Sequence, residues 1–299
     1  MHKTLYRGRF APSPTGPLHF GSLVAAVGSY LDAKHHLGIW LVRMEDLDTP
    51  RCVPGAAEDI LRTLDKFSLH SDEPILYQSQ RAAVYETALQ QLKHCGAVYP
   101  CACTRKEIAD SALHGIEGPV YPGICRDGIP AGREARAWRV RTDNEAIGFD
   151  DALQGRVSQR LENQVGDFVV RRADGLFAYQ LAVVMDDGLQ DITHVVRGAD
   201  LLSSTPRQIY LQHLLGLPKP HYMHLPIAVN DAGEKLSKQT LAAPVDVSQP
   251  AQTLVRVLDF LQQQPPGELK HSDVRTVLDW AIQNWNTKEL RGITTRPVP

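Results

Sequence analysis

The stretch RFAPSPTGPLHFGS, at residues 9–22, joins three kinds of predicted local structure. Residues 5–10 are predicted as a short strand, prolines and a glycine stiffen the following loop, and an apolar helix is expected to begin near Ser22. This order directs the free N–H groups of the helix start at a ligand above the strand, typically a phosphate. His19 could donate to a phosphoryl oxygen, and Gly21 would let a flat adenine ring approach the backbone. Taken alone, the same pattern also fits a proline-rich loop with a surface histidine.

A second stretch, KLSKQ at residues 235–239, follows a predicted strand at residues 225–229 and a turn. It places two ammonium groups and a hydroxyl on a loop, which can close over a triphosphate and neutralise charge that develops in the transition state. Alone, it is equally typical of a solvated charged loop. Two phosphate-binding patterns so far apart predict one folded nucleotide pocket, with His19, Lys235 and Lys238 as candidate catalytic residues.

These motifs resemble the signatures of the class I aminoacyl-tRNA synthetases of the glutamyl type. HFGS at residues 19–22 stands in place of the HIGH signature and KLSKQ in place of KMSKS, with departures at Ser22 and Gln239. RMEDLD at 43–48, AYQLAVVMDD at 178–187 and ITHVVRG at 192–198 match further motifs of that branch. Both departures are similar to one subgroup, the glutamyl-queuosine tRNA(Asp) synthetases, which are truncated relatives of glutamyl-tRNA synthetase. The resemblance covers residues 5 to about 245.

The resemblance implies an α/β fold with a Rossmann-type class I synthetase catalytic domain in two halves, residues 1–95 and 186–240. A zinc-bearing insertion is expected at residues 96–185 and a small helical module at residues 241–299. Glutamate would be bound by Arg9, Ala11, Ser13, Glu45, Tyr179 and Arg197, and ATP by His19, Gly21, Ser237 and Lys238. The arginines would favour the side-chain carboxylate of glutamate and Glu45 its ammonium, and Mg²⁺ would accompany the triphosphate.

The local patterns agree with these roles. Glu45 follows an apolar strand at residues 39–44, and carboxylates at the carboxyl end of a parallel strand point into the ligand crevice of an open α/β sheet. Arg197 closes another buried strand and can hold a carboxylate in a bidentate fork. Thr205 is predicted to be the N-cap of the next helix, with Pro206 at its first position.

Three of the five cysteines gather in one segment. Cys101, Cys103 and Cys125 flank a polar loop, a spacing that can form a tetrahedral metal site with one corner open. His114 is the ordinary chemical candidate for that corner, whereas the subgroup implies Tyr121, with one Zn²⁺ per chain. The alternative is a set of reduced structural cysteines. Cys52 and Cys95 are predicted to be packing residues.

Composition describes an ordinary intracellular enzyme of 299 residues, with 43% apolar and 22% charged residues. No apolar run approaches the roughly 20 residues of a membrane span, so we expect a cytoplasmic protein without a membrane partner. The net charge of −2 gives no global positive field that would indicate a nucleic-acid partner.

About sixty residues follow Lys238, too few for a large anticodon-binding domain, which is expected to be absent. The subgroup instead attaches glutamate to the queuosine base in the anticodon loop of tRNA(Asp). Two alternatives stay open. One is a truncated glutamyl or glutaminyl synthetase, or a ligase, acting on another acceptor. The other is a catalytically silent RNA-binding paralogue, against which the intact phosphate motifs argue.

Overall fold

The computed structural model describes residues 5–109, 114–115, 118–230, 233–235 and 243–298. Its centre is a parallel sheet in two pieces. Strand β1 (Arg7–Phe10) pairs with β2 (Ile39–Met44), which pairs with β3 (Leu76–Tyr77), and β11 (His194–Gly198) pairs with β12 (His221–Leu225). The backbone N–H of Thr193 donates to the carbonyl of Arg7 at 3.0 Å, so β1 and β11 lie side by side. The carboxyl ends of these strands therefore meet at one edge, as expected for a Rossmann-type fold.

Helix α1 (Phe20–His35) connects β1 to β2 and is buried along much of its length. It begins two residues before the predicted start near Ser22, because His19 serves as the N-cap. The His19 ring Nδ1 accepts from the backbone N–H of Ser22 at 3.3 Å. The histidine of the first motif thus terminates the stiff loop and starts the helix, a role usually taken by Ser, Thr, Asp or Asn.

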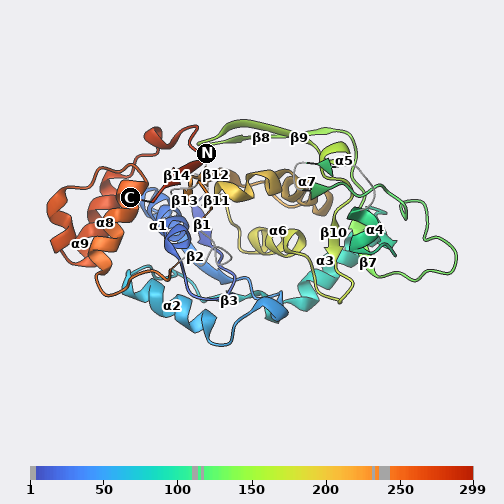
Figure 1. The fold of residues 1–299 in the computed structure, drawn as a ribbon, viewed down its shortest axis with the longest axis horizontal. Helices are drawn as coiled ribbons and strands as arrows, with labels where there is room; N and C mark the ends of the chain where they lie inside the picture. Colours follow the sequence, from blue (N-terminus) through green and yellow to red (C-terminus); the bar gives the residue numbers. More distant parts are fainter. Residues whose placement is uncertain (1–4, 110–113, 116–117, 231–232, 236–242, 299) are drawn as a thin grey trace.

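An antiparallel sheet of order β10-β7-β4 forms the far end of the molecule, to the right in Figure 1. Its strands are β4 (Val98–Cys101), β7 (Ala137–Val140) and β10 (Val169–Arg171). The shorter elements there are α4 (Arg105–Ala109), β5 (His114–Gly115), β6 (Gly118–Pro119) and α5 (Leu161–Gln164). The hairpin β8 (Ala146–Asp151) and β9 (Gly155–Arg160) runs back to the central sheet, where Asp151 pairs with Tyr222 of β12. The predicted boundaries of the insertion, 96–185, stay a prediction.

Helices surround the sheets. These are α2 (Ala56–Lys66), α3 (Ala82–His94), α6 (Tyr179–Leu189) and α7 (Thr205–Leu215), with the 3-10 turns η1 (Thr49–Arg51), η2 (Gln78–Gln80) and η3 (Ala199–Ser204). The buried carboxylate of Asp186 fixes α6, accepting from Gln78 Nε2 and Tyr85 Oη at 2.8 Å each.

The predicted capping of α7 was wrong. Ser204 is the N-cap and Thr205 the first helical residue. The turn η3 runs directly into α7, so Thr205 already has helical dihedrals, and its hydroxyl accepts from Arg197 Nη2 at 2.8 Å.

The last part of the chain packs on α1, at the left end of Figure 1. It comprises α8 (Pro250–Phe260), η5 (Gly267–His271), α9 (Val274–Asn284), η6 (Lys288–Leu290) and β14 (Thr295–Pro297), which pairs with β13 (Ile227–Val229). Both predicted helices, at residues 251–264 and 272–286, are present but end earlier. The rings of Phe20 and Phe260 meet edge to face at 5.6 Å, and Trp285 Nε1 donates to buried Asp32 at 2.9 Å.

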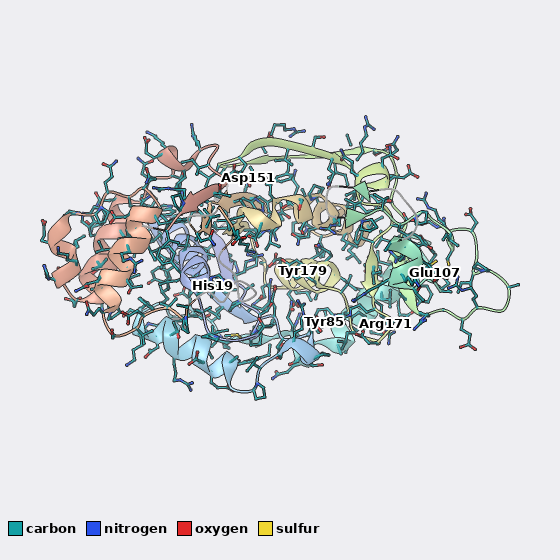
Figure 2. All side chains as sticks on the ribbon, viewed as in Figure 1. His19, Tyr85, Glu107, Asp151, Arg171 and Tyr179 are labelled. Atoms are coloured by element: carbon teal, nitrogen blue, oxygen red, sulfur yellow. The ribbon has the colours of Figure 1, made fainter. Side chains whose placement is uncertain are left out.

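Within the described part of the chain, no helix combines the length and the apolar character needed to cross a membrane. Figure 2 shows His19 and Tyr179 on different elements near the middle of the molecule, with Glu107 far out in the insertion.

Candidate active site

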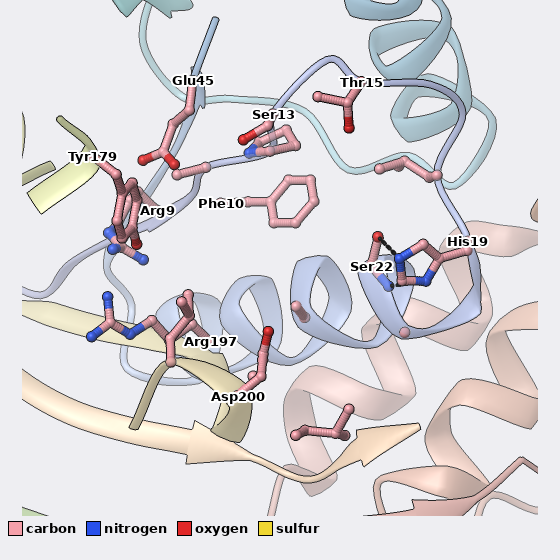
Figure 3. Close-up of a pocket in the computed structure, with 18 of the residues that line it drawn as sticks. Arg9, Phe10, Ser13, Thr15, His19, Ser22, Glu45, Tyr179, Arg197 and Asp200 are labelled. Atoms are coloured by element: carbon pink, nitrogen blue, oxygen red, sulfur yellow. Dashed lines mark hydrogen bonds between the residues drawn. The ribbon is translucent and has the colours of Figure 1, made fainter. Parts of the chain in front are cut away.

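A cavity of about 670 Å³ opens at the carboxyl ends of β1, β2 and β11. The predicted site residues that line it are Arg9, Ala11, Ser13, His19, Gly21, Glu45, Tyr179, Arg197 and Lys235. Figure 3 shows two ends of this pocket: Arg9, Glu45, Tyr179 and Arg197 gather at one, and His19 and Ser22 lie at the other. Residues more than two hundred positions apart thus share one cavity. Ser237 and Lys238 of the second motif lie outside the described residues.

Four charged side chains form a buried cluster at the first end, and two of them, Arg9 and Glu45, line the cavity. Asp187 accepts from Arg9 Nε at 3.0 Å and from Arg43 Nη2 at 2.8 Å. The same Arg43 nitrogen lies 3.6 Å from Glu45 Oε1, which accepts no hydrogen bond within the described structure. All four groups are at least nine-tenths buried, and their formal charges cancel. Of these four groups, Glu45 is the carboxylate that lines the cavity.

The two carboxylates of this cluster differ in proton affinity. Burial raises the pKa of Glu45 to about 7, although Arg43 and Arg9 oppose the shift. Burial also disfavours the charged form of Asp187, but its direct bonds to Arg9 and Arg43 hold the pKa of that carboxyl below its usual range. Asp187 is therefore a fixed structural anion, whereas Glu45 changes its charge near neutral pH.

Arg197 faces this cluster from β11. Its Nε donates to His224 Nε2 at 3.1 Å, and its Nη2 donates to Thr205 Oγ1 and Gln208 Oε1 at 2.8 Å each. Its Nη1 is buried and donates to no described group. Hydrogen bonds thus fix Nε and Nη2 of the guanidinium, whereas Nη1 is available to a ligand in the cavity.

Tyr179, Ala11 and Ser13 complete this end of the pocket. Tyr179 starts α6, and burial together with the nearby Glu45 raises the pKa of its phenol, which therefore stays protonated. Residues 11–17 are held by backbone hydrogen bonds from the end of β2 and beyond, including Glu45 N to Pro12 O at 2.9 Å and Val53 N to Pro14 O at 2.9 Å. Ala11 and Ser13 therefore have a fixed position beside Glu45.

At the other end, His19 lies over the start of α1. Besides the capping bond, its ring Nε2 lies 3.1 Å from Ser22 Oγ, so Ser22 supports the ring from the position where the general signature has a second histidine. A Cβ on Gly21 would lie 3.3 Å from His19 Cε1, closer than most carbon contacts, so a side chain at this position would push on the His19 ring. Lys235 reaches Asp200 Oδ2 at 2.5 Å, beside the same cavity.

The cysteine cluster lies outside this pocket, in the insertion. The sulfurs of Cys101, Cys103 and Cys125 all lie within 4.8 Å of one another and are buried. Tyr121 Oη is 3.4 Å from Cys101 Sγ and 3.6 Å from Cys103 Sγ. The Tyr121 hydroxyl thus lies beside the three sulfurs, and its role as a fourth ligand stays a prediction. The side chain of His114, the alternative, lies outside the described residues.

Sequence reasoning assigned no role to several groups that complete the site. Asp187 was visible only as the end of a motif, without its two arginine partners. Arg197 binds His224 and Gln208, and His224 binds Asp151, but no motif singled out these three residues. His224, which stands between the apolar Met223 and Leu225, offered a local signal.

The sequence and the fold place the chain among known proteins. Residues 6–256 match the family of class I tRNA synthetases (E and Q), catalytic domain. The chain belongs to this family. It is 64% identical over 282 residues to a glutamyl-Q tRNA(Asp) synthetase of Dechloromonas aromatica, covering 94% of each chain. A glutamyl-Q tRNA(Asp) synthetase of Aromatoleum aromaticum is 57% identical over 281 residues, covering 94% of this chain and 89% of that one.

The fold is that of the solved glutamate-tRNA synthetase from Elizabethkingia anophelis, with a TM-score of 0.78 at 24% identity. The alignment covers 98% of this chain and 68% of that one. The predicted class I synthetase fold, the resemblance to the glutamyl-queuosine subgroup and the assignment as a ligase are therefore confirmed.

Proposed function

We propose that this ligase activates L-glutamate with ATP and transfers the glutamyl group to queuosine in the anticodon loop of tRNA(Asp). One observation of the pocket supports the first substrate most strongly. Among the described residues, buried Glu45 Oε1 has no hydrogen-bond donor and buried Arg197 Nη1 has no acceptor. These two unmet groups complement an amino acid with an ammonium and a side-chain carboxylate, because buried polar atoms are normally hydrogen-bonded. The acceptor is supported by the two relatives described above, both glutamyl-Q tRNA(Asp) synthetases.

In the first step, an α-carboxylate oxygen of glutamate attacks the α-phosphorus of ATP, and the bond to pyrophosphate breaks. Arg9, Arg197 and Tyr179 hold the side chain of glutamate, Glu45 holds its ammonium, and Ala11 and Ser13 border it. His19 and Gly21 bind the nucleotide over the start of α1, with Lys235, Ser237 and Lys238 on the phosphates and Mg²⁺ accompanying them. The protein mainly positions the reactants and neutralises developing charge.

In the second step, a hydroxyl of the queuosine cyclopentene ring attacks the acyl carbon, and AMP leaves. A base in a single-stranded loop can be extruded and presented to a compact protein. The product is an ester, which mild alkali cleaves.

Zn²⁺ fits the cysteine cluster. Three buried sulfurs and the Tyr121 hydroxyl form a four-donor set, and thiolates are preferred ligands of Zn²⁺. Bound there, the ion would fix the loop between Cys103 and Cys125 as a structural element, outside the pocket.

Pyrophosphate exchange into ATP with single amino acids tests the first step. Exchange with glutamate is expected without tRNA, and Lys238→Ala is expected to lower it by about 10²–10³-fold. Equal exchange with glutamine or aspartate would contradict the assignment of the pocket.

The acceptor is tested with labelled glutamate and four RNAs. tRNA(Asp) carrying queuosine should accept label, also after removal of its 3′-terminal adenosine. Unmodified tRNA(Asp) and tRNA(Glu) should not. Mass spectrometry of the digested product should find glutamyl-queuosine. Charging of unmodified tRNA(Glu) that requires the 3′ adenosine would identify an acceptor-end synthetase instead.

A further inference from the structure

Arg197 differs from the other two arginines of the pocket in its partners. Arg9 and Arg43 both bind the carboxylate of Asp187, whereas no acidic group lies within ion-pair distance of Arg197 among the described residues. A neutral imidazole, a hydroxyl and an amide oxygen surround it instead. A guanidinium that is 5% exposed with no direct counter-ion is costly, so the arrangement requires an explanation.

We propose that Asp151 and His224 are positioning residues that fix Arg197 through one imidazole tautomer and keep its Nη1 available for the side-chain carboxylate of glutamate. The proposal rests on the proposed function and adds two residues to it. Asp151 comes from the hairpin β8–β9 and His224 from β12, so neither belongs to a motif that contacts substrate.

The hydrogen bonds determine the tautomer. Arg197 Nε can only donate, so His224 Nε2 must accept and carry no proton. The proton is therefore on Nδ1, which donates to Asp151 Oδ2 at 2.6 Å. The other oxygen, Asp151 Oδ1, accepts from the backbone N–H groups of Leu153, Gln154 and His224 at 2.9–3.2 Å. Four donors thus keep Asp151 an anion, and both side chains are fully buried.

The electrostatics of this pair serve the same end. Burial and the charge of Arg197 lower the pKa of His224, so the ring stays neutral, and the His224 hydrogen bond lowers the pKa of Asp151 against the effect of its burial. A carboxylate in direct contact with Arg197 would satisfy the guanidinium and compete with the substrate carboxylate. Because the imidazole lies between them, the negative charge of Asp151 stabilises the positive charge of Arg197 without direct contact. Arg197 Nη1 therefore remains available to bind an anion.

Three substitutions separate positioning from packing. In Asp151→Asn, the backbone donors retain the amide oxygen at Oδ1, so the NH₂ faces His224 Nδ1. The ring proton must then move to Nε2, where it opposes the N–H of Arg197. His224→Gln keeps an acceptor near Nε2, whereas His224→Asn keeps the bond to Asp151 and leaves Arg197 Nε without an acceptor.

We expect the glutamate KM in pyrophosphate exchange to rise about 10- to 100-fold in Asp151→Asn and His224→Asn, because both variants lose the hydrogen bond that Arg197 Nε donates to His224 Nε2. The rise should be smaller in His224→Gln, which keeps an acceptor for Arg197 Nε. The ATP KM should change by less than about twofold. Nitrogen NMR of the imidazole should show the Nδ1–H tautomer of His224 in the parent protein and the Nε2–H tautomer in Asp151→Asn.

Ser29→Ala is the matched control, since it removes a buried hydrogen bond, Trp40 Nε1 to Ser29 Oγ at 3.0 Å, away from the pocket. It should lower thermal stability without changing the glutamate KM. Arg197→Gln separates the positioning role of Asp151 and His224 from the proposed function. If it leaves the glutamate KM unchanged, the proposed function fails. If it raises that KM while the Asp151 and His224 variants do not, or if their ATP KM rises in parallel, only the positioning role is overturned.

Discussion

Glu45 gives the sharpest test of the glutamate end of the pocket. Its carboxylate, 9% exposed, balances a cluster in which Arg9, Arg43, Asp187 and Glu45 sum to zero charge. Glu45→Gln keeps the shape but leaves a net positive charge where the ammonium must bind. Two unit charges 4 Å apart interact by about 4 kcal/mol at an effective dielectric constant near 20, and truncating one partner of a buried charge pair costs about 2–5 kcal/mol. We expect kcat/KM for glutamate to fall by about 10²–10³-fold.

The pH dependence carries an independent signature of the same group. Burial raises the pKa of free Glu45 to about 7, so the charged form, which we propose binds the ammonium, is lost as the pH falls through neutrality. Between pH 8 and pH 6, kcat/KM for glutamate should fall about tenfold, because this parameter reports the free enzyme. The bound ammonium stabilises the carboxylate, so kcat should change little over the same range.

The assay is glutamate-dependent pyrophosphate exchange at saturating ATP and Mg²⁺, from pH 6 to 8. The acidic limb should be present in the parent protein and absent in Glu45→Gln. A parent profile that is flat over this range, or a Glu45→Gln variant with nearly normal kcat/KM, would refute the assignment of Glu45 to the ammonium.

Three further predictions concern other parts of the molecule. His19→Ala should lower pyrophosphate exchange by about 10²–10³-fold. His19→Asn, which restores an N-cap, should recover stability but not activity. If His19→Asn recovered both equally, the His19 ring would serve only as a helix cap. The protein should bind about one Zn²⁺ per chain. Cys125→Ser should reduce this zinc content, whereas Cys95→Ser, outside the cluster, should not. A protein that is fully stable without metal would contradict the zinc site. Burial, followed by the neighbouring His221, lowers the pKa of His194 to about 4. The unfolded chain therefore takes up that proton first, and the free energy of unfolding should fall as the pH drops from about 6.5 to about 4, a slope that His194→Gln should reduce in urea titrations.

Local patterns predicted much of the fold. The run 39–44 became β2 with the predicted bounds, because only Arg43 interrupts its apolar residues and a charged turn follows. The two C-terminal helices followed from their apolar spacing. The start of α1 was misplaced because a histidine is an uncommon N-cap, and Thr205 was misassigned because the turn η3 runs directly into α7.

The pocket was predictable where a motif carried it and otherwise not. Arg9, Glu45 and Arg197 stand in segments with a recognisable pattern, and all three line the cavity. Asp151 meets His224 only because the hairpin β8–β9 returns to β12, a pairing of segments seventy-three residues apart. No local preference encodes such a meeting, so the groups that orient Arg197 became visible only in three dimensions.

Helix α1 connects His19, at the edge of the pocket, with the C-terminal helices that pack along it. Its first residue, Phe20, packs on Phe260 of α8, and near its other end Asp32 accepts from Trp285 and His35 contacts the carbonyl of Ile282. The helix has 16 residues and, at 1.5 Å per residue, is about 24 Å long. A tilt of only about 5° at the Trp285 end would move His19 by about 2 Å, several times the roughly 0.5 Å tolerance of a productive site. The C-terminal helices thus hold both ends of α1, and the position of His19 in the pocket depends on how well they pack.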